Sequence, residues 1–365
     1  MEFIDLKTQQ KRIRAQLEER ISAVLDHGRY VMGPEIGELE GRLCDYLEVE
    51  HSIGVASGTD SLLIALMALG IGQGDEVITT PYTWISTAEV IALLGAIPVF
   101  VDIEPDTWNL DPTLLEDAIT ENTRAIMPVG IYGQTANMVA INEIAERNGN
   151  LPVIEDAAQS FGATHHGKRS GALSTIGSTS FFPSKPLGGY GEGGAIFTDD
   201  AGLAETMRQI RVHGEAERYT HPILGLNGRL DSMQAAVLLS KLEIFPEEVE
   251  LRQSVGERYD TLLADVDGIE CPQIAAENTS VYAQYTILCR NRDTVSARLS
   301  EQGIPSVAYY AKPMHLQPVF AGLGHGKGDF PVTERVSDLC LSLPMSPYLE
   351  EADQKRVASA IASAI

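Results

Sequence analysis

Short apolar segments alternate with helix-like segments between about residue 50 and residue 215 of this 365-residue chain. The strand-like segments are 75–79, 97–101, 124–129 and 153–154. This alternation is typical of a mostly parallel sheet with helices on both faces. Two further strand-like segments, 178–182 and 194–198, are close enough in sequence to form a hairpin-like pair. The pattern therefore predicts an α/β fold, built as a three-layer α/β/α sandwich.

The composition changes beyond about Pro246, where strands and helices become shorter and prolines recur. A single core usually stops growing at about 250–300 residues. The 44% of apolar residues is enough for two cores. We therefore expect a large domain over 1–245 and a smaller C-terminal α+β domain over 246–365.

Lys185 lies in the segment 180–195, SFFPSKPLGGYGEGGA, where an aromatic pair precedes it and glycines follow it. Pro186 favours an extended backbone at Lys185, and the glycines allow the chain to turn tightly against a bound group. This setting suits a lysine that forms an imine with a cofactor. The alternative is an ordinary lysine on a glycine-rich loop.

Asp156 follows Glu155 at the end of the apolar segment 151–154, which predicts a short buried strand. In open α/β sheets, ligands bind beyond the carboxyl ends of the strands. Pyridoxal phosphate (PLP) needs a lysine for its aldehyde and an acid that keeps its pyridine nitrogen protonated. Lys185 and Asp156 fit these two roles. A helix N-cap is the alternative role for Asp156.

The segment 57–59, Ser-Gly-Thr, precedes an apolar segment from Leu62 to Leu69 that predicts a buried helix. The start of a helix offers unpaired backbone N–H groups, and small hydroxyl side chains suit a phosphate. We therefore expect a phosphate to bind at Ser57, Gly58 and Thr59. A plain helix cap is the alternative.

Together these segments resemble the DegT/DnrJ/EryC1/StrS family of sugar aminotransferases. The resemblance covers nearly the whole chain and is carried by 57–59, 155–159, 180–195, 227–230, 234–236 and the terminal segments 3–6, 309–317 and 343–345. It implies the fold-type I architecture of PLP-dependent enzymes, which is similar to aspartate aminotransferase. We call the segment 180–195 the lysine loop. Its Ser-Lys-Pro-Leu-Gly sequence resembles the branch of the family that aminates C3 of UDP-linked 3-keto-hexuronic acids.

The resemblance also implies roles for residues around the cofactor. Trp84 matches an aromatic residue that stacks on the ring, and a Trp buried against the sheet is the alternative. Gln159, expected one helical turn after Asp156, matches a residue that hydrogen-bonds the ring hydroxyl. Ser180 matches a phosphate-binding serine. Asn227 matches a residue that reaches the phosphate from the neighbouring subunit, which implies a homodimer with shared active sites.

Three residues match the substrate end of the family's site. Arg229 suits a sugar carboxylate or phosphate because a guanidinium forms paired hydrogen bonds, and an interface salt bridge is the alternative. Tyr309 and His315 match positions near the sugar, and a structural histidine is the alternative for His315. His213 resembles a histidine that borders the site.

The resemblance implies a transamination in two halves. L-Glutamate leaves as 2-oxoglutarate, and the pyridoxamine phosphate that remains aminates a nucleotide-linked keto sugar. The lysine loop favours C3 of a UDP-2-acetamido-2-deoxy-3-keto-hexuronic acid, for cell-surface polysaccharide biosynthesis. A dTDP- or UDP-linked 4-keto-6-deoxyhexose is the alternative substrate, and a non-enzymatic PLP-binding or regulatory protein is the alternative class. Related dehydratases carry His at the lysine position, so Lys185 argues against dehydration.

Composition excludes other classes of protein. The net charge of −24, from 27 Lys and Arg against 51 Asp and Glu, argues against a nucleic-acid surface. The four cysteines lack the spacing of a metal site, which predicts reduced core residues at Cys44, Cys271, Cys289 and Cys340. Because neither a basic leader nor an apolar segment of about 20 residues is present, we expect a cytoplasmic protein without a membrane span.

Overall fold

One mixed β-sheet lies at the centre of the N-terminal part of the computed structural model, which describes residues 1–365. Parallel bridges from Ile126 to Val153 and from Val129 to Asp156 join its two halves. The strand order is β3 (Ile97–Phe100), β2 (Glu76–Thr79), β4 (Thr123–Ile126), β5 (Ile154–Asp156), β8 (Ile176–Ser180), β9 (Gly194–Thr198) and β1 (His51–Val55). β9 alone runs in the direction opposite to the other strands, so the mostly parallel sheet and the hairpin-like pair of β8 and β9 are confirmed.

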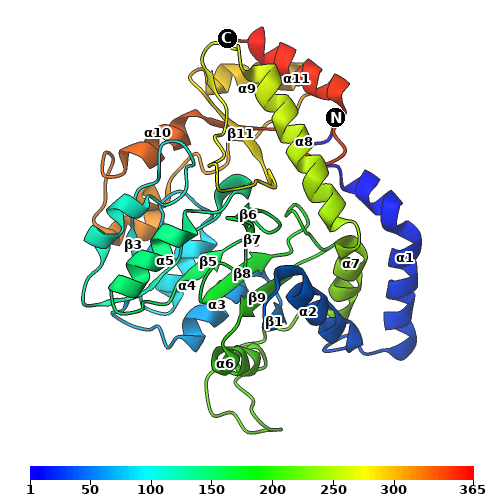
Figure 1. Cartoon of the computed structure of the whole chain (residues 1–365), viewed down its shortest axis with the longest axis vertical. Helices are drawn as coiled ribbons and strands as arrows, with labels where there is room; N and C mark the ends of the chain where they lie inside the picture. Colours follow the sequence, from blue (N-terminus) through cyan, green and yellow to red (C-terminus); the bar gives the residue numbers. More distant parts are fainter.

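Helices cover both faces of this sheet (Figure 1). One face carries α3 (Gly58–Ala68), α4 (Ser86–Leu93) and α6 (Ala201–Arg211). The other carries α2 (Pro34–Leu47), α5 (Met138–Arg147) and α7 (Ser232–Leu242). Because side chains alternate along a strand, Ile196 packs in the core of the first face and Phe197 in the core of the second. The predicted three-layer α/β/α sandwich is confirmed.

A helix start at Ser57 and a helical turn after Asp156 were expected, and both are present at the carboxyl ends of parallel strands. Ser57 caps α3, and its Oγ accepts from Asp60 N at 3.0 Å. The helical turn expected after Asp156 is a single isolated turn over 157–162, in which Phe161 N donates to Ala157 O at 2.9 Å. Gly162 ends it, because its φ of 101° is incompatible with a continuing helix.

A smaller sheet with its own core lies in the C-terminal part. Tyr259, Ile287 and Val357 belong to that core. The α+β character matches the sequence-based expectation, whereas the boundary at residue 245 stays a prediction. The elements are α8 (Phe245–Leu263), the antiparallel strands β10 (Ile269–Glu270), β11 (Tyr285–Cys289) and β12 (Cys340–Leu343), and helices α9 (Arg292–Glu301), α10 (Pro331–Leu339) and α11 (Glu351–Ala362).

The N-terminal helix α1 (Leu6–His27) packs against α7 through contacts of Ile13 and Leu17 with Val237. No helix has the length and apolar character required to span a bilayer, and no cluster of three or more His, Cys, Asp and Glu side chains could hold a metal. The four cysteines are free. The remaining elements are β6 (Thr164–His165), β7 (Lys168–Arg169) and the 3₁₀ helices η1 (Pro112–Leu114), η2 (Glu116–Ala118), η3 (Ile131–Gly133), η4 (Met314–Leu316) and η5 (Pro318–Leu323).

Candidate active site

A cavity of about 430 Å³ opens at the carboxyl ends of β1, β2, β5 and β8, and loops from the C-terminal part complete its wall. This is the edge of an open α/β sheet at which ligands bind. The structure brings together in this wall the predicted residues Ser57, Gly58, Thr59, Trp84, Asp156, Gln159, Ser180, Lys185 and Tyr309.

The first turn of α3 and the end of β8 form one end of the cavity. A Cβ added at Gly58 would lie 2.6 Å from Ser180 Cβ, so only glycine allows the helix to approach the strand this closely. The Thr59 hydroxyl lies 2.9 Å from Ser86 Oγ. Hydroxyl groups and the N-terminus of a buried helix suit a dianionic phosphate, which also interacts favourably with the helix dipole.

Glu155 and Asp156 occupy opposite faces of β5, because side chains alternate along a strand. Glu155 points away from the cavity and accepts from Ser170 Oγ at 2.7 Å, Gly171 N at 2.9 Å and Leu173 N at 3.2 Å. Asp156 is 6% exposed and faces the cavity. Only Asp156 can therefore meet a ligand there.

Asp156 is a buried acid whose hydrogen bonds come from uncharged donors. Thr87 Oγ1 donates to its Oδ2 at 3.1 Å, and Ala158 N donates to its Oδ1 at 3.2 Å. Burial raises the pKa of Asp156, and the Ala158 N–H and the Lys185 amine oppose that rise. A protonated pyridine nitrogen would supply the compensating charge that this carboxylate needs.

Lys185 shares the cavity with Asp156. Burial lowers the pKa of its amine, and the Asp156 carboxylate partly opposes that shift. A lowered pKa increases the fraction of neutral, nucleophilic amine, as imine formation requires. The loop is closed by two backbone bonds, from Lys185 N to Phe182 O at 2.8 Å and from Gly189 N to Phe181 O at 2.7 Å.

Trp84 has an exposed fraction of 61% and lines the cavity. The alternative of a Trp buried against the sheet is therefore wrong. Its ring is available to a ligand, as a stacking residue requires.

Asn227 and Arg229 do not line the cavity of their own chain. They lie in the segment between α6 and α7, where Asn227 is exposed and Arg229 is half-buried. The backbone of Arg229 bridges that of Val55, only two residues before Ser57. His213, in the same segment, is exposed and also lies outside the cavity wall.

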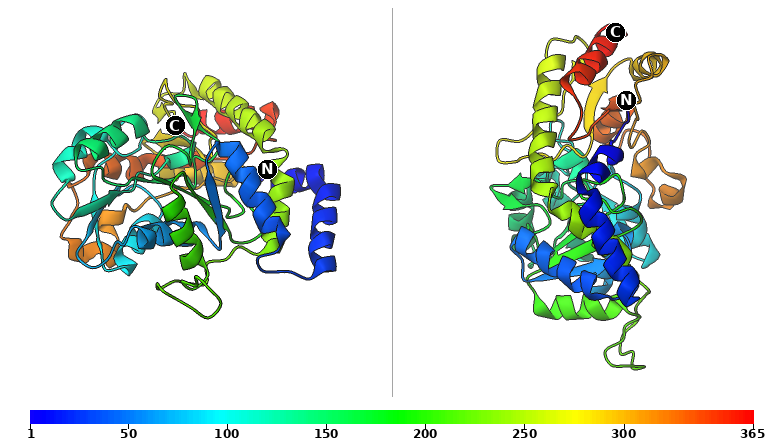
Figure 2. Two further views of the ribbon diagram at one scale, coloured as in Figure 1. Left: turned by 60° about the horizontal axis from the view of Figure 1, so that its bottom comes forward. Right: turned by 90° about the vertical axis from the view of Figure 1, so that its right-hand side faces the viewer.

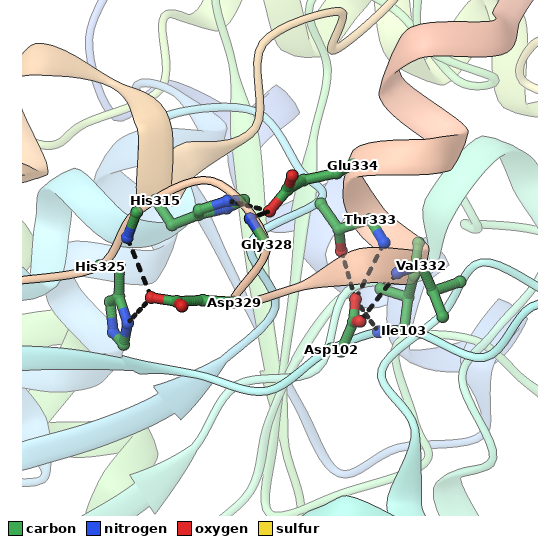
Figure 3. A network of polar contacts seen from close by, with 10 residues as sticks. Asp102, Ile103, His315, His325, Gly328, Asp329, Val332, Thr333 and Glu334 are labelled. Carbon is green, nitrogen blue, oxygen red and sulfur yellow. Dashed lines mark hydrogen bonds and ion pairs between the residues drawn. The ribbon is translucent and has the colours of Figure 1, made fainter.

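The structure corrects the expectation that His315 contacts the sugar. Its side chain is fully buried, and Nε2 lies 3.2 Å from Glu334 Oε1 (Figure 3). The ring packs against Phe330 with 4.7 Å between centroids, and burial lowers its pKa. His315 thus holds the segment before α10 in place, which is the structural alternative.

Sequence reasoning missed several residues of the wall. Thr83, Ser86 and Thr87 surround Trp84 in the sequence, and that proximity was the available signal. Gln284 and Tyr310 come from the C-terminal part, and no spacing links them to the lysine loop. The other missed residues are Leu62, Ala158, Phe182, Ser184 and Glu192.

The residues present fit PLP. A lysine amine with a lowered pKa, a buried acid in the same cavity and a helix N-terminus held against a serine meet the needs of its aldehyde, its ring nitrogen and its phosphate. On the three-layer sandwich described above, this set defines a fold-type I PLP-dependent enzyme.

The chain belongs to the DegT/DnrJ/EryC1/StrS aminotransferase family, whose model matches residues 11–362. It is therefore a PLP-dependent aminotransferase. A relative from Pseudomonas aeruginosa PAO1 named UDP-2-acetamido-2-deoxy-3-oxo-D-glucuronate aminotransferase is 54% identical over 361 residues, 99% of each chain. A Geobacillus stearothermophilus relative named pleiotropic regulatory protein is 45% identical over 362 residues, 99% of this chain and 97% of its own.

Among solved structures, the crystal structure of S. venezuelae DesV in complex with a ketimine intermediate has a TM-score of 0.97 to this chain. The two chains are 41% identical, and the match covers 99% of this chain and 97% of the other. The resemblance to fold-type I enzymes that the sequence implied is thus confirmed.

Proposed function

We propose that this chain transfers the amino group of L-glutamate to C3 of a UDP-2-acetamido-2-deoxy-3-keto-hexuronic acid. The observation that carries the substrate is the 54% identity, over 99% of both chains, to the Pseudomonas aeruginosa enzyme named for such a sugar. The observation that carries the chemistry is the presence of Lys185 and Asp156 in one cavity.

PLP, when bound, supplies an electron-accepting ring that stabilises negative charge on the carbon next to the transferred nitrogen. With PLP bound, Asp156 would keep a proton on the ring nitrogen. Gln159 would hydrogen-bond the ring hydroxyl, and Trp84 would cover the ring. Ser57, Gly58, Thr59 and Ser180 would hold the phosphate.

Lys185 is the proton carrier of both halves. With PLP bound, its amine would take the proton from the α-carbon of L-glutamate and pass it to the cofactor in the first half. In the second half it would take that proton back from the cofactor and deliver it to the sugar carbon. Burial lowers the pKa of Lys185, which increases the fraction of neutral amine available as a base. One lysine therefore serves both halves.

We propose that the active form is a homodimer with shared sites. The segment between α6 and α7 projects from the body as a long loop (Figure 2). Tyr219 and Leu224 on this loop are 80% and 88% exposed, and a second copy would bury them. Asn227 would then reach the phosphate of the partner's site.

Arg229, in the same segment, would meet the sugar carboxylate of the partner's site, and Tyr309 would contact the sugar within its own chain. The Arg229→Ala variant tests this assignment. This variant should weaken the binding of a uronate far more than the binding of a 6-deoxy sugar, because only the uronate has the carboxylate. Equal losses for the two sugars would contradict the role of Arg229.

The central test is the visible absorption of the PLP-loaded protein during titration with L-glutamate. The absorption band of the bound PLP should disappear with glutamate. It should return with the UDP-linked 3-keto uronate, but not with a dTDP-linked 4-keto-6-deoxyhexose. Return with only the second sugar would reassign the substrate. A protein that never binds PLP would favour a regulatory role, and Lys185→Ala serves as the control without a band.

We further propose that the protein acts in the cytoplasm, in the synthesis of O-antigen or a related cell-surface polysaccharide. Deletion of its gene should remove the amino sugar from that polysaccharide, and an unchanged sugar composition would contradict the proposal. We keep the division into domains 1–245 and 246–365 as a proposal, since α8 begins at Phe245 and leads into the separate C-terminal core.

A further inference from the structure

Lys241 is a buried lysine that lies outside the cavity and contacts the lysine loop. Its residue is 1% exposed, and Nζ donates to Gly188 O at 2.6 Å. Nζ also lies 4.4 Å from the centroid of the Tyr190 ring, a favourable position for a cation. Lys241 therefore contacts two residues of the loop that carries Lys185.

A second side chain of α7 binds the same loop. Gln234 Oε1 accepts from Tyr190 N at 2.8 Å. Gln234 and Lys241 are seven residues apart, which places them on one face of a helix. One face of α7 thus binds the Gly188 carbonyl and the Tyr190 amide.

The backbone position of Lys185 depends on that of Gly188. A Cβ on Gly188 would lie 2.6 Å from both Phe182 O and Pro183 O, so Gly188 packs directly on the residues that precede the lysine. Phe182 O also accepts the Lys185 N–H at 2.8 Å. A shift of Gly188 would therefore displace the backbone of Lys185.

Ion pairing does not explain the burial of Lys241. Burial lowers its pKa to about 8, and the carboxylate that opposes this shift is Glu248. Glu248 already accepts from Gln9 Nε2 at 2.9 Å and from the Tyr348 hydroxyl. An apolar side chain would avoid the desolvation of a buried ammonium group.

We propose that Lys241, with Gln234, is a positioning residue that holds the Gly188–Tyr190 backbone so that Lys185 projects correctly into the cavity. Neither side chain lines the cavity, so both act through the loop. The proposal concerns the lysine chemistry of any substrate and does not depend on the identity of the sugar.

The test compares Lys241→Met with Lys241→Gln, which keeps a hydrogen-bond donor. In the Met variant, the rate at which PLP is captured by the cofactor-free protein and the rate of the glutamate half-reaction should each fall about tenfold or more. The KM for glutamate should stay within about twofold of the wild-type value. The pH titration of the bound cofactor's absorption should shift, and the Gln variant should recover part of the lost rate.

Ser240→Ala is the matched control. Ser240 is buried beside Lys241 on α7, but its Oγ bonds to Ala236 O within the helix at 3.0 Å. The control should keep the wild-type rates. The unfolding temperature of cofactor-free Lys241→Met should stay near the wild-type value, because removal of a buried charge offsets the lost bond to Gly188 O.

Wild-type rates and a wild-type pH titration in Lys241→Met would overturn the proposal. So would an equal loss of rate in Ser240→Ala, since that would indicate general loosening of α7. If Lys241→Met does not fold, Gln234→Met provides the same readouts through Tyr190 N. An unchanged capture rate in a folded Gln234→Met protein would then overturn the proposal.

Discussion

Gln159 Nε2 donates to the Tyr310 hydroxyl at 3.0 Å, which joins the loop after β5 to the C-terminal part of the chain. Gln159 Oε1 accepts from Tyr132 N at 3.1 Å. Both ends of the amide are therefore fixed, and one N–H of Nε2 remains for a ligand. Tyr132 and Tyr310 have φ values of 56° and 63°, in the left-handed region where non-glycine residues are strained and often serve a site.

Tyr310→Phe should release the Gln159 amide from this arrangement. We expect a loss of about 1 kcal/mol in the free energy of unfolding, because Gln159 loses a buried hydrogen-bond partner. If the transition state loses the same stabilisation of about 1 kcal/mol, kcat/KM for glutamate should fall about fivefold. Urea unfolding and steady-state kinetics measure the two effects. Unchanged kinetics would show that the bond does not orient Gln159.

Asp156→Asn removes the charge of this residue and nearly keeps its shape. Asparagine is nearly isosteric, and the Thr87 hydroxyl can rotate to accept from the new amide, so folding should persist. Loss of the negative charge should slow the glutamate half-reaction about 100-fold or more, because the ring nitrogen loses its proton partner. Single-turnover absorption measures this rate. A near-normal rate in a protein that binds a full complement of PLP would contradict the role of Asp156.

Glu155 should make the stability of the fold depend on pH. Burial raises its pKa from 4.5 to about 7. The folded state then binds the proton more tightly than the unfolded state, so the free energy of unfolding decreases as the pH rises from about 4.5 to about 7. Glu155 should contribute about 3 kcal/mol to this decrease.

The measurement is urea unfolding of the cofactor-free protein across that pH window, compared with Glu155→Gln. The Gln variant cannot ionise at this position, so its stability should depend less on pH. Parallel pH curves for the two proteins would rule out Glu155 as the source. The variant should still fold, because its amide oxygen can accept from Gly171 N and Leu173 N while its N–H groups meet the Ser170 hydroxyl, which can rotate to accept.

Gly58→Ala should damage the phosphate end of the cavity without destroying the fold. The new Cβ would lie 2.6 Å from Ser180 Cβ and 3.1 Å from its Cα, so α3 must move away from β8. We expect PLP to dissociate about tenfold more readily, because the helix N-terminus then meets the phosphate less well. Spectroscopic titration of the cofactor-free protein measures the Kd.

Gly37→Ala is the matched control for this substitution. Gly37 lies on α2, and a Cβ there would meet nothing within 4 Å. Alanine at this exposed helical position should stabilise the protein by about 0.5–1 kcal/mol and leave the Kd unchanged. Equal Kd values for the two variants would show that the contact of Gly58 with Ser180 does not shape the phosphate site.

The sequence predicted those parts of the site that follow directly from strand ends. Asp156, Lys185 and Ser57 each lie next to an apolar segment, so their place at the sheet edge could be expected. Tyr310 reaches the same cavity only because the C-terminal part packs over it. A contact between residues so distant in sequence depends on packing, and no local pattern encodes it.

The burial of His315 and the exposure of Trp84 could not be predicted from the sequence either. A lone histidine carries no signal of direction, and the pairing of His315 with Glu334 depends on how η4 packs against α10. Trp84 is a large apolar side chain, yet the turn before α4 leaves it exposed in the cavity wall. Composition cannot distinguish these two outcomes, because both depend on tertiary contacts.

Mixed dimers test whether two chains share each active site. Chains with Lys185→Ala and chains with Asn227→Asp should each be inactive alone. If Asn227 serves the partner's cavity, a mixed dimer contains one complete site, so random mixing should restore about a quarter of wild-type activity. A mixture of Lys185→Ala and Asp156→Asn chains is the control, because Lys185 and Asp156 lie in the cavity of one chain and no site regains both. Recovery in the first mixture alone would support sites shared between subunits, whereas no recovery in either mixture would assign Asn227 to its own chain.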